Sequence, residues 1–195
     1  VMAQNDTISK SVYFYQPVAY PYQETFEDSA TWNTWNTYNP DADPIYWMMS
    51  GVVRGSLNYA KNGTHAAYIS SAAGVAHDDW LISPAINITQ TGKQRLSYFY
   101  VTTFSAALST EKTDLEAYVS KAGTPAELEQ VEPIAIDEIT DDNVNVYKQG
   151  FATVDITEPG LYYVAFHNLG MGHDIVLDDV RLDNYADVAI TTASH

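Results

Sequence analysis

Two neighbouring aspartates interrupt an apolar segment near the C-terminal end of the chain. In HDIVLDDVRL, alternation with a period of two places Asp178 on one face of a strand with Val176 and Val180, and Asp179 on the opposite face with Arg181. Whichever face is buried, one carboxylate enters an apolar environment. An unpaired charge in such a place costs several kcal/mol, so the buried carboxylate needs a cation, a protonated partner or backbone N–H groups.

The partner differs for the two aspartates. Arg181 lies two residues beyond Asp179 on the same predicted face and can pair with it, whereas nothing equally local serves Asp178. A hard metal ion is the natural candidate, and Ca²⁺ is preferred because it accepts roughly six to eight oxygen ligands in flexible geometry. The segment therefore predicts a cation site at Asp178.

The overall charge is consistent with cation binding and disfavours other partners. The 195 residues include 25 Asp and Glu against 9 Lys and Arg, a formal net charge of −16, which is equally typical of an acidic protein that is merely soluble. So few cations disfavour binding to nucleic acid and to anionic membranes. Membrane insertion is not expected, because no stretch approaches about 18 continuous apolar residues. The absence of Cys excludes disulfides and thiolate sites.

Aromatic residues around one polar loop are candidate ligand contacts. Trp35, Tyr38, Tyr46 and Trp47 flank this loop, and an exposed ring there can stack on the apolar face of a sugar. Rigid amphipathic rings also suit recognition surfaces in general. Trp80 lies inside the apolar run DDWLISPAI and is expected in the core instead.

Catalytic signatures are weak throughout the sequence. There is no G-x-S-x-G elbow, no H-E-x-x-H pair and no glycine-rich phosphate loop. His167 and His173 bracket the segment NLGMG, which allows a metal or haem ligand pair, but a strand histidine and a turn histidine are the favoured interpretation. Several glutamates are present, and nothing selects two of them as a glycosidase pair. We therefore expect a protein that is not an enzyme.

The elements that position these residues are predominantly short strands. Turn signals recur every 8–15 residues between Glu24 and Leu182, and RLSYFYVTTF is apolar on both faces, as expected for a central strand. One helical turn is predicted at TPAELEQ, with Pro125 in its first position. Strands without long intervening helices predict an all-β, antiparallel two-sheet sandwich of the jelly-roll kind.

The chain divides into three parts by composition. Residues 1–23 are expected to be an extension or linker with a short strand, because Pro17 and Pro21 prevent a long one. Residues 24–183 form the predicted jelly-roll domain. Residues 184–195 are expected to form an exit strand or the start of a following module.

Several segments, taken in order, resemble a known family. They are ETFEDSATWNTW, DADPIYW, HDDWLISPAINIT, RLSYFYV, LEAYVSKAGT and GLYYVAFHNLGMGHDIVLDDVRL. Together they resemble the cleaved adhesin (choice-of-anchor J-like) domains of Bacteroidetes, the repeated modules of gingipain and haemagglutinin adhesins. The resemblance implies a jelly roll similar to carbohydrate-binding modules and MAM domains. It also implies structural calcium and a surface-exposed binding role.

The resemblance also implies particular ligands for the ion. In the family the opening T-F-E and the closing L-D-[DE]-V segments are joined through calcium, which makes Glu27 and Asp178 the main candidates here and Asp28 and Asp179 the second ones. An ion that joins segments so distant in sequence is expected to stabilise the fold substantially.

A second acidic loop departs from the family pattern DADGDGxxW. In DADPIYW two aspartates remain at positions i and i+2, the spacing of a loop calcium site, but the following Gly-Asp-Gly is missing. An Asx turn is the alternative interpretation, and the preceding Asn-Pro favours it.

The functional expectation follows from the family. We expect a calcium-stabilised adhesin or binding module of a protein secreted by, or on the surface of, a Gram-negative bacterium, with a host extracellular protein or glycan as partner and further domains in a larger parent protein. A carbohydrate-binding module accessory to a secreted glycosidase or peptidase is one alternative, and a structural spacer is another.

Overall fold

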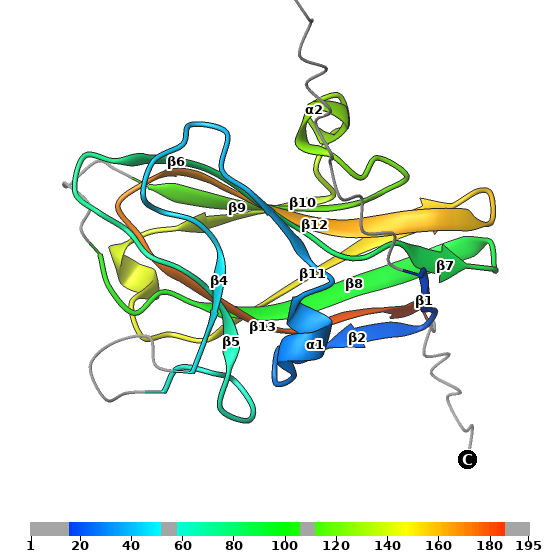
Figure 1. The fold of residues 1–195 in the computed structure, drawn as a ribbon, viewed down its shortest axis with the longest axis horizontal. Coiled ribbons are helices and arrows are strands. Elements are labelled where there is room, and N and C mark those ends of the chain that lie inside the picture. Colours follow the sequence, from blue (N-terminus) through cyan, green and yellow to red (C-terminus); the bar gives the residue numbers. More distant parts are fainter. Residues whose placement is uncertain (1–15, 52–57, 106–111, 186–195) are drawn as a thin grey trace, which may run out of the picture.

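Short strands joined by turns make up most of the molecule (Figure 1). The computed structural model describes residues 16–51, 58–105 and 112–185. The first strands are β1 (Val18–Ala19), β2 (Tyr22–Glu24), β3 (Asn36–Tyr38), β4 (Met48–Ser50), β5 (Ala66–Ile69), β6 (Ala76–Ile82), β7 (Ile86–Ile88) and β8 (Gly92–Val101). They are followed by β9 (Thr113–Ser120), β10 (Ala135–Ile139), β11 (Lys148–Ile156), β12 (Gly160–Met171) and β13 (Ile175–Asn184). The helical segments are α1 (Ser29–Trp32), α2 (Pro125–Leu128) and the 3-10 turn η1 (Asp141–Asn143).

The strands form two sheets that lie face to face (Figure 1). The seven-stranded sheet is built around β12, which pairs with β6, β7 and β9, while β1, β3 and β10 lie further out. The six-stranded sheet has the order β11-β8-β13-β5-β4, and β2 also pairs with β13. The predicted two-sheet sandwich is confirmed. Its strand pairs are antiparallel as expected, apart from the short strand β1, which runs parallel to β7.

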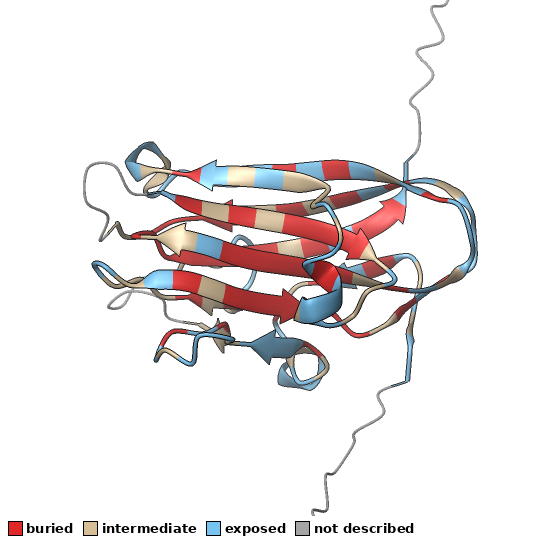
Figure 2. Cartoon of the chain, turned by 90° about the horizontal axis from the view of Figure 1, so that it is seen from above, coloured by how far each residue is buried: buried red, intermediate tan, exposed pale blue. Residues whose placement is uncertain are grey.

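Alternation along β8 shows how the sequence builds the core. Leu96 and Tyr98 are buried between the sheets, whereas Arg95 and Ser97 point out of the sandwich. As expected for a central strand, β8 has a neighbour on each side, namely β11 and β13. Figure 2 shows the same pattern across the molecule, with buried residues along the strands and exposed residues at the loops.

A second, smaller apolar cluster lies outside the main core. It joins Trp80 of β6 and Tyr118 of β9 to Leu128 of α2, which is fully buried. The predicted helical turn is confirmed, with Pro125 at its start. Trp80 is buried as expected, but it belongs to this cluster beneath α2 rather than to the main core.

Two of the four candidate ligand-binding aromatics are buried. Trp35 and Trp47 are only 6% and 1% exposed and belong to the main core, so the expectation that these two rings form an exposed platform is wrong. Tyr38 and Tyr46 are exposed at 37% and 48%.

The burial of Trp47 has a local cause. The Asn39 side-chain amide donates to the backbone carbonyls of Asp43 (2.8 Å) and Ile45 (3.0 Å), which closes the acidic loop on itself. Ile45 and Trp47 then follow the loop into the core, and the indole N–H of Trp47 donates to the carbonyl of Asp79. The sequence pattern did not reveal this fold-back, because it depends on one side-chain amide.

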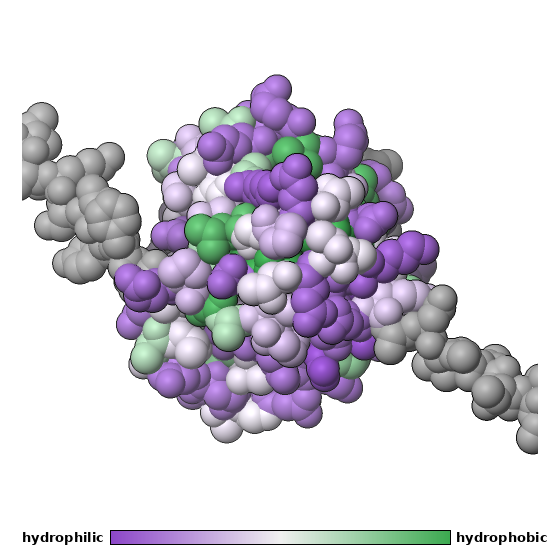
Figure 3. All heavy atoms as spheres, turned by 90° about the vertical axis from the view of Figure 1, so that its right-hand side faces the viewer, coloured by the Kyte–Doolittle hydropathy of each residue, from purple (hydrophilic) through white to green (hydrophobic). Residues whose placement is uncertain are grey.

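The outer surface is mostly polar. At the end of the molecule that Figure 3 shows, apolar residues occur in small groups separated by polar ones. Among the described residues, no helix combines the length and the apolar character needed to cross a membrane.

We predict that adjacent residues 46 and 47 respond very differently to truncation. Trp47→Ala should lower the free energy of unfolding by about 3–5 kcal/mol, because it leaves a large cavity in the main core. Tyr46→Ala, its matched control on the surface, should change that free energy by less than about 0.5 kcal/mol. Urea denaturation of both variants measures the difference. Equal effects would contradict the placement of Trp47 in the core.

Candidate functional site

A bulge in β13 positions the predicted aspartates. Ile175 and Leu177 face the main core, and so do Val180 and Leu182, which have the opposite parity. The pairing of β13 with β8 shifts between Asp178 and Arg181. Simple alternation along this strand, which placed Asp178 on the face of Val180, is therefore wrong.

The change of face occurs at Asp179. Its φ of 50° is in the left-handed region, which non-glycine residues seldom adopt and aspartate tolerates better than most. One extra residue at such a bulge lets the strand continue with its apolar side chains inward. As a result the side chains of Asp178 and Asp179 both reach the loop at residues 61–65.

Asp178 binds the backbone of this loop. Its Oδ2 accepts N–H groups from Lys61 (2.7 Å) and Asn62 (3.2 Å), and its Oδ1 accepts the N–H of Asp179 (2.7 Å). The residue is only 2% exposed. Burial raises the pKa of its carboxyl to about 6, although these three donors act in the opposite direction. The buried carboxylate predicted from the sequence is thus confirmed for Asp178.

Glu27 binds the other side of the same loop. Its Oε1 accepts the backbone N–H groups of Thr64 (2.8 Å) and His65 (2.6 Å). Desolvation opposes ionisation of Glu27, but these donors outweigh it and lower the pKa. Gly63 has a φ of 72°, and a Cβ there would lie 2.4 Å from the Glu27 Cδ, so the turn needs glycine for both conformation and space.

We call this arrangement the carboxylate junction: Glu27, Asp178 and Asp179 with the loop at residues 61–65. Segments separated by 37 and 117 positions meet there. The Asn62 amide donates to Asp179. Among the described residues, no Lys or Arg side chain forms an ion pair with any of the three carboxylates.

Two expected partners have other roles. Asp28 caps α1, because its Oδ1 accepts the N–H of Ala30 (2.8 Å), and no described contact joins it to the junction. Arg181 pairs with Asp183 through Nε (2.7 Å) rather than with Asp179, so that expectation is wrong. The bulge is the reason, because it moves Asp179 out of the alternation on which the expected pair depended.

The junction fits a calcium ion in donor type but not as a complete ligand set. Its carboxylate oxygens are the donors that Ca²⁺ prefers. Within the described ranges, no group of three or more His, Cys, Asp or Glu side chains is arranged to hold a metal ion. Side chains of the junction would therefore supply only part of a calcium shell, and loop carbonyls or water would have to supply the remainder.

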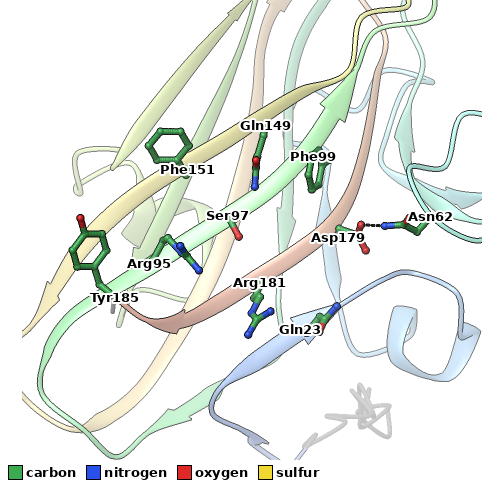
Figure 4. Close-up of a pocket in the computed structure, with 10 residues that line it drawn as sticks. All are labelled: Gln23, Asn62, Arg95, Ser97, Phe99, Gln149, Phe151, Asp179, Arg181 and Tyr185. Atoms are coloured by element: carbon green, nitrogen blue, oxygen red, sulfur yellow. Dashed lines mark hydrogen bonds between the residues drawn. The ribbon is translucent and has the colours of Figure 1, made fainter. Parts of the chain in front are cut away.

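Beside the junction, a groove of about 560 Å³ crosses the outer face of the six-stranded sheet (Figure 4). We call it the sheet groove. Strands β2, β13, β8 and β11 contribute its lining, with Tyr185 at one end and Asn62 at the other. Because Asp179 and Asn62 also belong to the junction, the two features share this end.

The middle of the groove is a row of four residues in register. Ser97 of β8 lies between Phe151 of β11 on one side and Arg181 of β13 on the other. Gln23 of β2 lies opposite Arg181 and completes the row. Ser97 has a short side chain between larger neighbours, and this difference in size leaves the hollow. Phe151 is 70% exposed, an unusual state for a large apolar side chain.

Sequence reasoning missed this groove. On β8 the residues Arg95, Ser97 and Phe99 share the outward face, and on β11 so do Gln149 and Phe151. The signal was an outward face that mixes aromatic and polar side chains. Strand order could not be obtained from the sequence, and without it the faces of β8 and β11 could not be joined.

A second polar cluster lies inside the sandwich. Both carboxylate oxygens of Asp79 and both ring nitrogens of His77 are buried without a hydrogen-bond partner among the described residues. Burial, followed by the charges of Asp43, Asp41 and Asp78, raises the pKa of Asp79 to about 7. Burial lowers the pKa of His77.

The acidic loop beside this cluster adopts the Asx turns expected from its sequence. Asp41 accepts the N–H of Asp43 (3.3 Å), and Asp43 accepts the N–H of Ile45 (2.6 Å). Both aspartates thus stabilise their own loop backbone.

The two bracketing histidines have separate partners. His167 lies between Asp78 (2.8 Å) and Glu116 (3.0 Å) and stacks on Trp80, whereas the ring of His173 contacts Asp141 (3.2 Å). Because the described contacts place them in different side-chain clusters, a shared metal or haem is not supported.

Comparisons with known proteins agree with this architecture. The sequence pattern described as Cleaved Adhesin Domain matches residues 19–182. The chain belongs to this family. No curated protein sequence matches the chain.

Solved structures share the fold. The K1 cleaved adhesin domain of Lys-gingipain from Porphyromonas gingivalis W83 superposes with a TM-score of 0.58 at 19% identity, over 85% of this chain and 98% of that domain. The C-terminal family 22 carbohydrate binding module of Clostridium thermocellum Xyn10B gives 0.52 at 16%, over 83% and 91%. TmCBM61, solved with β-1,4-galactotriose, gives 0.53 at 14%, over 83% and 99%. The cleaved adhesin chain is therefore similar in fold to carbohydrate-binding modules.

We predict that the contribution of Asp79 to the free energy of unfolding falls as pH rises. Since its pKa is raised from 3.8 to about 7 in the folded state, the folded protein binds more protons than the unfolded chain between these values. Its contribution to the free energy of unfolding is therefore lost as pH rises through this window.

The Asp79→Asn variant isolates this contribution. The free energy of unfolding of Asp79→Asn minus that of the wild type should rise between about pH 4 and pH 7, by at most about 4 kcal/mol. Urea titrations at several pH values measure it, and Asp155→Asn on the exposed face of β11 is the matched control. A difference that does not change with pH would show that Asp79 titrates normally.

Proposed function

We propose that this cleaved adhesin domain is a non-catalytic binding module that holds a saccharide in the sheet groove. The observation that carries the proposal is the exposed ring of Phe151 facing Arg181 across the short Ser97. An aromatic ring beside planar hydrogen-bonding groups suits a sugar, which has both apolar C–H faces and hydroxyl edges.

The groove is built on rigid elements. Its central row comes from four hydrogen-bonded strands, so the backbone is already ordered before a ligand arrives. Preorganised sites lose less conformational freedom on binding. Gln23 and Gln149 add amide groups that can donate to and accept from hydroxyls.

Similar folds support the proposal. TmCBM61 was solved with a galactotriose, and the family 22 module is a carbohydrate-binding module. The gingipain similarity supports a module of a secreted or surface protein that contacts a host glycan or host protein, attached to further domains. Tyr38 and Tyr46 form a separate exposed surface and remain the alternative contact.

We predict that Phe151→Ala strongly weakens saccharide binding. Loss of the ring removes the stacking surface, and affinity should fall by at least about tenfold. A glycan array followed by calorimetric titration of the retained glycan measures it. Ile136→Ala, which truncates an exposed apolar residue on the other sheet, is the matched control, and Tyr46→Ala tests the alternative surface. Failure to bind any glycan, or unchanged binding by Phe151→Ala, would refute the proposal that the sheet groove binds a saccharide.

We further propose that Ca²⁺ binds at the carboxylate junction with Glu27 and Asp178 as its acidic ligands. Three carboxylates gather at one loop without a described Lys or Arg partner, and burial holds the pKa of Asp178 well above its usual range. A cation would offset this unfavourable charge. When bound, it would supply charge neutralisation and a link between the first and last parts of the domain.

Chelation tests the calcium proposal. Saturating Ca²⁺ should raise the melting temperature by about 5–10 °C over protein in EGTA, because binding at about 100 times Kd stabilises the folded state. Asp178→Asn should lose this response, whereas Asp43→Asn, the same change in the acidic loop, should keep it. A wild-type protein that contains no metal and does not respond to EGTA would contradict the site. Loss of the calcium response in Asp43→Asn but not in Asp178→Asn would place the ion in the acidic loop instead.

A further inference from the structure

The arginines of this chain are unevenly placed. The sequence contains three, Arg54, Arg95 and Arg181, in a protein with a net charge of −16. Two of the three line the sheet groove. The groove therefore carries two positive side chains on a protein whose net charge is strongly negative. Solubility does not account for this placement, which suggests a role in binding.

One buried carboxylate holds both guanidinium groups. The Oδ2 of Asp183 lies 2.7 Å from Nε of Arg181 and 3.4 Å from an Nη of Arg95. The Asp183 side chain is only 12% exposed, whereas those of the arginines are 53% and 45% exposed. Within this described cluster, two positive charges share one negative charge, which leaves one positive unit of charge.

Arg181 retains donors for a ligand. Its described contact uses Nε, which leaves the two terminal Nη groups without a described protein partner. Fixing a guanidinium through one edge orients the other edge, and a carboxylate is the planar anion that matches the remaining fork. The buried Asp183 thus acts as a positioning residue for the exposed face of Arg181.

The two ends of the groove have opposite character. Figure 4 shows Arg95, Phe151 and Tyr185 toward one end and Asp179 with Asn62 at the other. Neutral sugar hydroxyls are satisfied by amides alone, and such amides are present in the groove. The arginine end adds to these amides a planar, charged fork, which matches a ligand that carries a negative charge there.

We propose that the sheet groove takes an acidic saccharide, with a uronic acid carboxylate on Arg181 and Arg95 and the sugar ring on Phe151. This rests on the proposed function and adds the ligand class. Phe151 and Arg181 lie two strands apart across Ser97, a separation of roughly 9–10 Å between backbones that accommodates a sugar ring between the side chains.

Matched ligands test the charge directly. The probes are trisaccharides ending in glucuronate or galacturonate, each paired with its own methyl ester, which keeps the ring and removes the charge. At low salt the acid should bind the wild-type protein about tenfold more tightly than the ester, the effect of one charge-assisted contact. This advantage should shrink as NaCl is raised, because salt screens exposed charges.

Matched variants then locate the charge. Arg181→Gln should remove most of the advantage of the acid over the ester, and because this advantage is a ratio of two affinities, hydrogen bonds that both ligands make to Arg181 cancel in it. Lys121→Gln removes the same unit of charge from another sheet and should keep the full advantage. Arg95→Gln provides a second groove variant, and melting curves establish that each variant is folded.

The outcomes separate this inference from the proposed function. Equal binding of acid and ester, lost in Phe151→Ala, would overturn the acidic ligand and leave the saccharide site in place. An acid preference that survives Arg181→Gln and Arg95→Gln would also overturn it. Absence of binding by acids, esters and every glycan of the array would overturn both.

Discussion

The contact on which this domain depends is the binding of one loop by two carboxylates from distant parts of the chain. Glu27 accepts N–H groups from one side of the turn, and Asp178 accepts them from the other. These bonds satisfy the backbone of a segment that belongs to no sheet, and they connect the loop to β13 and to the segment between β2 and α1. The same arrangement concentrates negative charge, which is why we propose the cation site at the junction.

The groove follows from the junction and from strand alternation together. Inward residues of β8 fill the core, so its outward residues are free to form a surface with their neighbours on β11 and β13. Asn62 and Asp179 belong to both features. The sheet groove, on the outside of the sandwich, therefore shares two residues with the contact that joins distant parts of the chain.

Much of the fold could be predicted from alternation and turn signals. The two-sheet sandwich, the central position of β8, the turn at Pro125 and the buried charge of Asp178 all follow from local patterns. Such patterns report which side of a strand is apolar. They work where burial is decided within a few residues of chain.

The errors share one physical cause, because each depends on contacts between distant segments or on a single backbone irregularity. Trp47 is buried because its loop folds back through Asn39, which composition cannot reveal. Arg181 meets Asp183 because a bulge changes the register. The groove needs the order of strands. Of the predicted exit strand at residues 184–195, the part after residue 185 lies outside the described residues.

The bulge has a consequence for how the segment LDDV tolerates change. Asp178 is needed for its charge, whereas Asp179 is also the additional residue of the bulge. A different side chain at position 179 keeps the residue count, so Val180 and Leu182 stay inside. Deleting that position removes the bulge, and strict alternation from Leu177 then still places Val180 and Leu182 inside, opposite the same residues of β8. A deletion here therefore leaves the core pattern intact and instead costs the loop at residues 61–65 its contact with Asp179.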